Sequence, residues 1–98
     1  MANFYHVFIQ PKKGVTNDQI EEKMNLSYDW FRCTHSVWVL YSTAKIDKWQ
    51  KRLRPLVDPD GSLFVCRLDI TKRNGWMSQQ FWDWIKENEN RTQSGSRG

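Results

Sequence analysis

Alternation of apolar and polar positions along the chain predicts four short strands. In Asn3–Gln10, aromatic and β-branched residues occupy both alternating sets of positions, which is typical of a central strand covered on part of each face. Thr34-His35 separates two further apolar runs, and because this dipeptide is not a favoured hairpin turn we expect a longer turn. Asp58-Pro59-Asp60-Gly61 is a strong turn signal before the last run. The predicted strands are residues 3–10, 28–33, 36–42 and 63–68.

Helical spacing of apolar residues predicts one helix after the first strand and another at the end of the chain. Thr16 and Gln19 fit a capping box at the start of the first helix, which is expected to end at Leu26. Ser78 is the predicted cap of the last helix, residues 79–88. The apolar residues expected on the buried faces are Ile20 and Met24 in the first helix and Phe81, Trp82 and Ile85 in the last.

A third helix is predicted between the third and fourth strands. Ser42 or Thr43 can cap it, and it is expected to fray near Arg54 because a residue that precedes proline, here Pro55, disfavours helical backbone. Its apolar stripe follows spacings of three, four and three residues: Ile46, Trp49, Leu53 and Leu56.

The order strand, helix, strand, strand, helix, strand, helix matches the split βαβ pattern. It predicts an α+β, ferredoxin-like βαββαβ fold. Such a fold has a four-stranded antiparallel sheet in the spatial order 4-1-3-2, two helices on one face and, here, an added C-terminal helix. Two helices leave one sheet face uncovered. Either a second subunit or the last helix covers it, and we favour a homodimer.

The chain has the length of one domain, with 98 residues, and six Trp among its 14% aromatic residues. Residues 1–88 are predicted to form that domain, and residues 89–98, which contain no apolar side chain, a disordered tail. No apolar run approaches the roughly 20 residues of a membrane span, and the N-terminus lacks a signal-peptide pattern. We therefore expect a cytoplasmic protein without a membrane partner.

The net charge of +4 is concentrated in residues 45–73, which hold eight basic and four acidic residues, whereas the rest of the chain is balanced. Such a local excess favours a polyanionic partner, DNA or RNA, and the alternative is a solvated surface. Three of these cations share one flank of the helix predicted after residue 43. The candidate nucleic-acid contacts are Lys45, Lys48, Lys51, Arg52, Arg67, Lys72 and Arg73.

Histidine and cysteine offer little that points to catalysis or metal binding. His6 and His35 are weak candidates for a general base, because the sequence places no acid or nucleophile beside either of them. Cys33 and Cys66 belong to no metal-ligand motif and are expected as reduced thiols on opposite sheet edges, too far apart for a disulfide. No cofactor or metal site is predicted.

The tryptophans can fill the core, stack on bases or form a protein interface. Trp76, Trp82 and Trp84 are the interface candidates. Because Trp82 and Trp84 are separated by about 200° on a regular helix, both cannot face inward. We expect at least one of these two side chains at an interface or in solvent.

Three segments carry a resemblance to a known family. Cys33–Thr43 resembles the signature hairpin of the SinR-like proteins, which are small ferredoxin-like relatives of the CRISPR-associated adaptation nuclease. Val57–Leu68 resembles their turn and fourth strand, and Trp76 follows that strand in the same way. The resemblance covers residues 3–77 and implies a homodimer with apposed sheets or edges, together with nucleic-acid binding.

The resemblance also bears on catalysis. In the nuclease relatives, an aspartate at the end of the first strand helps to hold a divalent metal at the dimer interface. The matching position here is Gln10, and a neutral amide is a poor substitute for a carboxylate at a magnesium site. Asp18 belongs to the next helix and does not replace it. The resemblance therefore implies a catalytically impaired relative.

Three functions follow as hypotheses. The first is a small dimeric nucleic-acid-binding protein that acts in bacterial or phage defence, a toxin–antitoxin system or a mobile element. The second is a ribonuclease or deoxyribonuclease of a toxin–antitoxin or defence system that is active without the aspartate. In one version of this hypothesis a histidine is the general base. The third is a protein–protein adaptor that captures its partner through a Trp-rich surface.

Overall fold

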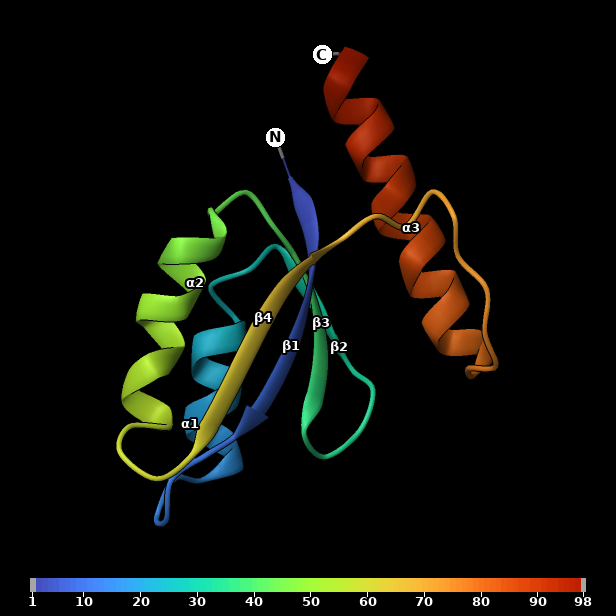
Figure 1. Cartoon of the computed structure of the whole chain (residues 1–98). Helices are drawn as coiled ribbons and strands as arrows, with labels where there is room; N and C mark the ends of the chain where they lie inside the picture. Colours follow the sequence, from blue (N-terminus) through green and yellow to red (C-terminus); the bar gives the residue numbers. More distant parts are fainter. Residues whose placement is uncertain (1, 98) are drawn as a thin grey trace.

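The central strand, β1 (Asn3–Gln10), is apolar on both of its faces, and the sheet is built around it. The computed structural model describes residues 2–97, and side chains for residues 2–91 (Figure 1). β1 pairs antiparallel with β3 (Val37–Ser42) on one side and β4 (Ser62–Leu68) on the other. β2 (Asp29–Arg32) pairs antiparallel with β3 and completes the order β2-β3-β1-β4. This confirms the predicted spatial order and the ferredoxin-like α+β fold.

One face of the sheet packs against α1 (Asn17–Met24) and α2 (Ile46–Leu53), and α2 continues into a 3-10 turn, Arg54–Leu56. The capping box at Thr16 and Gln19 is present, with both side-chain bonds formed. The core on this side is made of side chains from β1, β3, the two helices and the 3-10 turn with the residue after it: Tyr5, Val7, Ile9, Ile20, Met24, Trp38, Leu40, Trp49, Leu53, Leu56 and Val57. Ile20 and Met24 are buried as predicted.

The opposite face of the sheet packs against α3 (Gln79–Arg97), so the sheet lies between two helical layers (Figure 1). Trp84 meets Phe4 of β1 edge-to-face, with ring centroids 5.9 Å apart. Buried Asn88 donates its side-chain amide to the Asp29 carboxylate of β2, at 3.1 Å. The sequence predicts that either a second subunit or the last helix covers this face, and in the structure the last helix covers it. The second core consists of Phe4, Val39, Tyr41, Trp84 and Ile85.

The start of α2 differs from the sequence prediction. Its N-terminal cap is Lys45, without a side-chain cap bond, rather than Ser42 or Thr43. Ser42 is still the last residue of β3, and its buried hydroxyl accepts hydrogen bonds from the Ala44 N–H and from Nε1 of Trp49. Ile46 is 38% exposed rather than buried, because it lies in the first turn and borders an open hollow.

α3 is also longer than predicted. Ser78 caps it as expected, since its hydroxyl accepts the Phe81 N–H at 3.3 Å. The helix then continues through residues 89–97, where the sequence predicts a disordered tail. No proline interrupts this segment, and Glu89 is bonded to Arg73 of the folded domain, which ties the extension to it. Residue 98 lies outside the described residues.

Other boundaries agree with the sequence. Four residues, 33–36, join β2 to β3, so the turn is longer than two residues as predicted. The chain turns through Val57–Asp60 before β4, and the Asp58–Pro59 peptide bond is cis. Within residues 2–97, no helix combines the length and the apolar composition needed to cross a membrane.

The packing of α3 leads to a stability prediction. Trp84→Ala is expected to lower the free energy of unfolding by about 3–5 kcal/mol, because it leaves a large cavity between α3 and the sheet. Trp82→Ala removes the same side chain from a half-buried position of the same helix and is expected to cost about 1 kcal/mol. Urea unfolding of the full chain measures both values. Equal costs for the two variants would contradict the packing of Trp84 against the sheet.

Candidate nucleic-acid interface

α2 and its N-terminal cap present a row of exposed lysines. The burial of Trp49 and Leu53 fixes the orientation of the helix and leaves Lys48 and Lys51 in solvent. Lys45, Lys48 and Lys51 are all exposed. In the part of the chain that the structure describes, no ion pair within 4.0 Å involves any of the three. Their charges are therefore available to an external anion.

Arg52 differs from these lysines because it packs on the core. Its guanidinium carbon lies 4.8 Å from the centroid of the Trp49 ring, a cation–π arrangement. The side chain is half-buried, and one terminal nitrogen, Nη1, is buried without a hydrogen-bond partner among the described residues. Arg52 thus contributes positive potential at the surface, but part of its side chain belongs to the structure of α2.

Arg67 of β4 joins the lysines of α2. In the β1–β4 register it lies opposite Tyr5, whose side chain packs in the core under α1 and α2, so Arg67 projects from that face of the sheet. A hollow of about 290 Å³ separates it from the start of α2. The hollow is lined by Asn3, Tyr5, Lys45, Ile46, Asp47 and Arg67. One carboxylate, that of Asp47, shares this hollow with the two cations.

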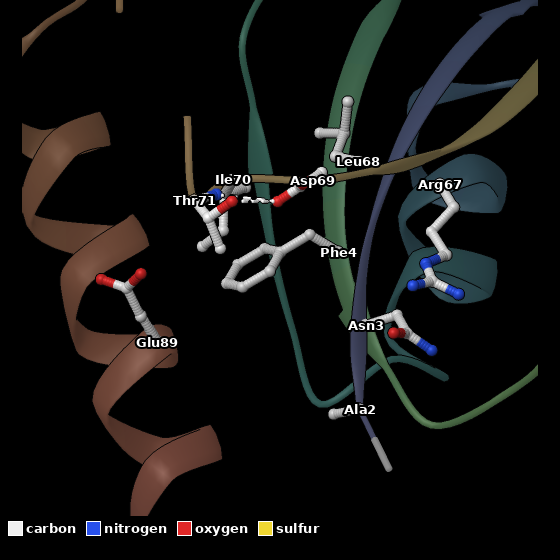
Figure 2. A pocket seen from close by; sticks show the side chains of 9 residues that line it. All are labelled: Ala2, Asn3, Phe4, Arg67, Leu68, Asp69, Ile70, Thr71 and Glu89. Atoms are coloured by element: carbon white, nitrogen blue, oxygen red, sulfur yellow. Dashed lines mark hydrogen bonds between the residues drawn. The ribbon is translucent and has the colours of Figure 1, made fainter. Parts of the chain in front are cut away.

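A second hollow, of about 430 Å³, opens where β1 begins and β4 ends (Figure 2). Asn3 and Arg67 line both hollows, so the two hollows adjoin at this end of the sheet. Figure 2 shows that Arg67 points to the opposite side of the sheet from Phe4. The residues that line this hollow are Ala2, Asn3, Phe4, Arg67, Leu68, Asp69, Ile70, Thr71 and Glu89.

The carboxylate of Asp69 in this second hollow is held in its charged form. The Thr71 hydroxyl donates to it at 2.6 Å and the Thr71 N–H at 3.0 Å. These bonds, and then the positive charge of Arg67, hold the pKa of Asp69 below its usual value. Together with Glu89, this carboxylate makes the second hollow mixed in charge.

The last two predicted contacts lie beyond β4, in the segment that leads to α3. Lys72 is exposed, whereas Arg73 donates two hydrogen bonds to the Glu89 carboxylate, at 3.0 and 3.2 Å, and a third to the Ile70 carbonyl. Arg73 therefore anchors this segment to α3. The sheet separates α2 from α3, so the seven predicted cations form one surface at α2 and Arg67 and a separate pair at 72 and 73.

The three tryptophans predicted at an interface lie in three different environments. Trp84 is buried in the core under α3, so it is not available at the surface. Trp82 is half-buried, with its ring 5.3 Å from that of Phe81. Trp76 is 99% exposed. The expectation that Trp82 and Trp84 cannot both face inward agrees with this placement, since only Trp84 is fully packed.

The two histidines lie in different parts of the fold, and His6 has a neighbour, Cys66, that the sequence did not indicate. His35 is exposed in the β2–β3 turn, where its carbonyl accepts a bond from Arg32. His6 is half-buried in β1, directly opposite Cys66 of β4 in the strand register. Only knowledge of the β1–β4 register reveals this pair. No group of three metal-ligating side chains is found within the described residues.

Both cysteines are free thiols, as the sequence predicts. Cys66 lies in edge strand β4 and Cys33 directly follows β2 at the other edge of the sheet, so the predicted separation is confirmed. Burial raises the pKa of the Cys33 thiol and so lowers its thiolate fraction at neutral pH.

The end of β1 offers a divalent metal little that it would bind. Gln10 is exposed and lies opposite Ser62 in the strand register. A neutral amide and a hydroxyl supply none of the carboxylate oxygens that a magnesium ion prefers. Asp18 lies in α1, as predicted. Gln10 and Ser62 therefore provide no carboxylate ligand at this strand end.

Comparison of the chain with protein-family models, curated proteins and solved structures finds no match.

Proposed function

We propose that the chain binds nucleic acid through phosphate contacts made by the outer surface of α2 and by Arg67. The observation that carries the proposal is the row of exposed lysines on α2, Lys45, Lys48 and Lys51, which have no ion pair among the described residues. Arg67 extends this row from the neighbouring edge strand. The short resemblance to the SinR-like proteins points to the same class of partner.

The spacing of the lysines suits a polyphosphate. With a rise of about 1.5 Å per residue, Lys45 and Lys51 are separated by about 9 Å along the helix. One strand of DNA presents a phosphate about every 3.4 Å of duplex axis, so two to three phosphates fall within this length. Lysines that contact only phosphates supply affinity without reading a sequence. The proposed binding is therefore electrostatic and largely independent of sequence.

Charge reversal on α2 tests this proposal. Lys48→Glu/Lys51→Glu is expected to weaken duplex binding roughly 10- to 100-fold near 0.1 M salt, because each lost phosphate contact removes about one decade of affinity. The slope of log K against log[salt] should become less steep by about 1.8. Fluorescence anisotropy with a labelled duplex, measured over a salt series, gives both quantities.

The control is Lys13→Glu/Lys86→Glu, which makes the same change in net charge at two exposed lysines outside α2. It is expected to weaken binding less and to leave the salt slope near the wild-type value. If the two double variants lose the same affinity, the effect comes from net charge alone, and the assignment of the site to α2 is wrong.

The proposal includes a homodimer formed through β4. This strand is an edge of the sheet, and its Phe64 side chain is 60% exposed. An edge strand can pair antiparallel with its own copy across a two-fold axis, which satisfies the same unpaired backbone groups in both subunits. Because Arg67 lies on this strand, such a dimer would bring two basic surfaces onto one continuous sheet and increase the number of phosphate contacts.

Sedimentation measurements test the dimer. The wild-type chain is expected to sediment as a dimer at micromolar concentration, and Phe64→Glu as a monomer, because the variant buries a charge in the subunit contact. Leu26→Glu is the matched control, since Leu26 is an apolar side chain that is 54% exposed outside β4. A wild-type monomer, or a dimer unaffected by Phe64→Glu, would exclude pairing through β4.

A further inference from the structure

Trp76 is the one tryptophan that the fold leaves in solvent. Its side chain is 99% exposed, whereas the other five are buried or half-buried in the two cores and at their margins. A tryptophan that packs in a protein buries about 150–250 Å². At Trp76 this whole area, including both faces of the indole ring, is open to a partner.

The chain segment that carries Trp76 contacts the domain both before and after this residue. Before it, Arg73 is bonded to Glu89 and to the Ile70 carbonyl, and Gly75 lies against the ring of Trp82, since a Cβ placed there would be 3.9 Å from it. After it, Ser78 caps α3. Trp76 is therefore held away from the core between two fixed points.

The surroundings of Trp76 favour a nucleotide over an apolar protein surface. All residues from 71 to 80 are exposed, and apart from Trp76 and Met77 they are polar, charged or glycine. A protein interface needs a contiguous, well-packed apolar centre, which one ring among polar residues does not provide. A nucleotide needs one aromatic face for its base and a cation for its phosphate. Trp76 and Lys72 supply these two groups within five residues.

We propose that Trp76 stacks on an unpaired base of a single-stranded nucleic acid and that Lys72 contacts an adjacent phosphate. This inference rests on the proposed function, because it adds a base contact to the phosphate contacts proposed at α2 and Arg67. Arg67 borders both hollows, and Thr71 of the second hollow directly precedes Lys72. A strand bound at α2 can thus pass across the end of β4, where this hollow lies, to reach Trp76. In a duplex the bases are already stacked and offer no free face to the ring.

The test compares single-stranded DNA, single-stranded RNA and a duplex of the same sequence by anisotropy at fixed salt. Trp76→Ala is expected to weaken single-strand binding about 5- to 150-fold, the range found when one base–aromatic stack is removed. Duplex binding and the salt slope should be unchanged, because no phosphate contact is lost. Trp76→Phe should retain most of the affinity, and the neighbouring Met77→Ala should behave as wild type.

The outcomes separate the two proposals. If Lys48→Glu/Lys51→Glu weakens binding and Trp76→Ala does not, the stacking inference is wrong and the α2 site stands. Equal loss on single strands and duplex also overturns it. If the wild-type chain binds none of the three probes at low salt, both proposals fail. If Trp76→Ala instead converts a dimer into a monomer in sedimentation, Trp76 lies between subunits and the inference is rejected.

Discussion

The structure depends on burying both faces of a four-stranded sheet with a short chain. β1 imposes this requirement, because Tyr5, Val7 and Ile9 point to one side and Phe4 to the other, and all four are buried. α1 and α2 cover the first side. The second side requires another element, and α3 meets it by placing Trp84 and Ile85 against Phe4, Val39 and Tyr41. Residues that complete the second core are thus unavailable for binding.

This requirement also determines which groups face outward. With Trp49 fixed in the core and stacked against Arg52, the remaining cations of α2 face solvent. On the other side of the sheet, the chain must travel from the end of β4 to the start of α3. Arg73 fixes that connection to α3 through its bond to Glu89. Trp76 lies in the same connection, where its side chain packs against neither core and is exposed. The two proposed contacts with nucleic acid therefore both follow from how the sheet is covered.

Much of the fold follows from local signals. The apolar residues on both faces of β1, the capping box at Thr16 and the proline after Arg54 each specify a local structure that the fold retains. The exposure of the α2 lysines follows from the spacing of Trp49 and Leu53. Signals of this kind need no knowledge of distant parts of the chain.

The remaining features depend on contacts between distant residues. Helical spacing shows that Trp82 and Trp84 face apart, but only the docking of α3 decides that Trp84 is the buried one. The sequence predicts Arg73 as a phosphate contact, but in the fold its guanidinium pairs with Glu89. Local patterns do not reveal this pair, because the two residues are 16 positions apart in the chain. Ser42 has the residue type of a helix cap, but pairing with β1 makes it the last residue of β3. The proximity of His6 and Cys66 requires the strand register.

The most direct test of the account is the salt dependence of binding between the wild-type chain and a duplex without a chosen sequence. Phosphate contacts from Lys45, Lys48, Lys51 and Arg67 predict that log K falls linearly with log[salt], with a slope of about −3 to −4 per protomer. A slope near zero, or no binding at low salt, would contradict the claim that this surface binds nucleic acid.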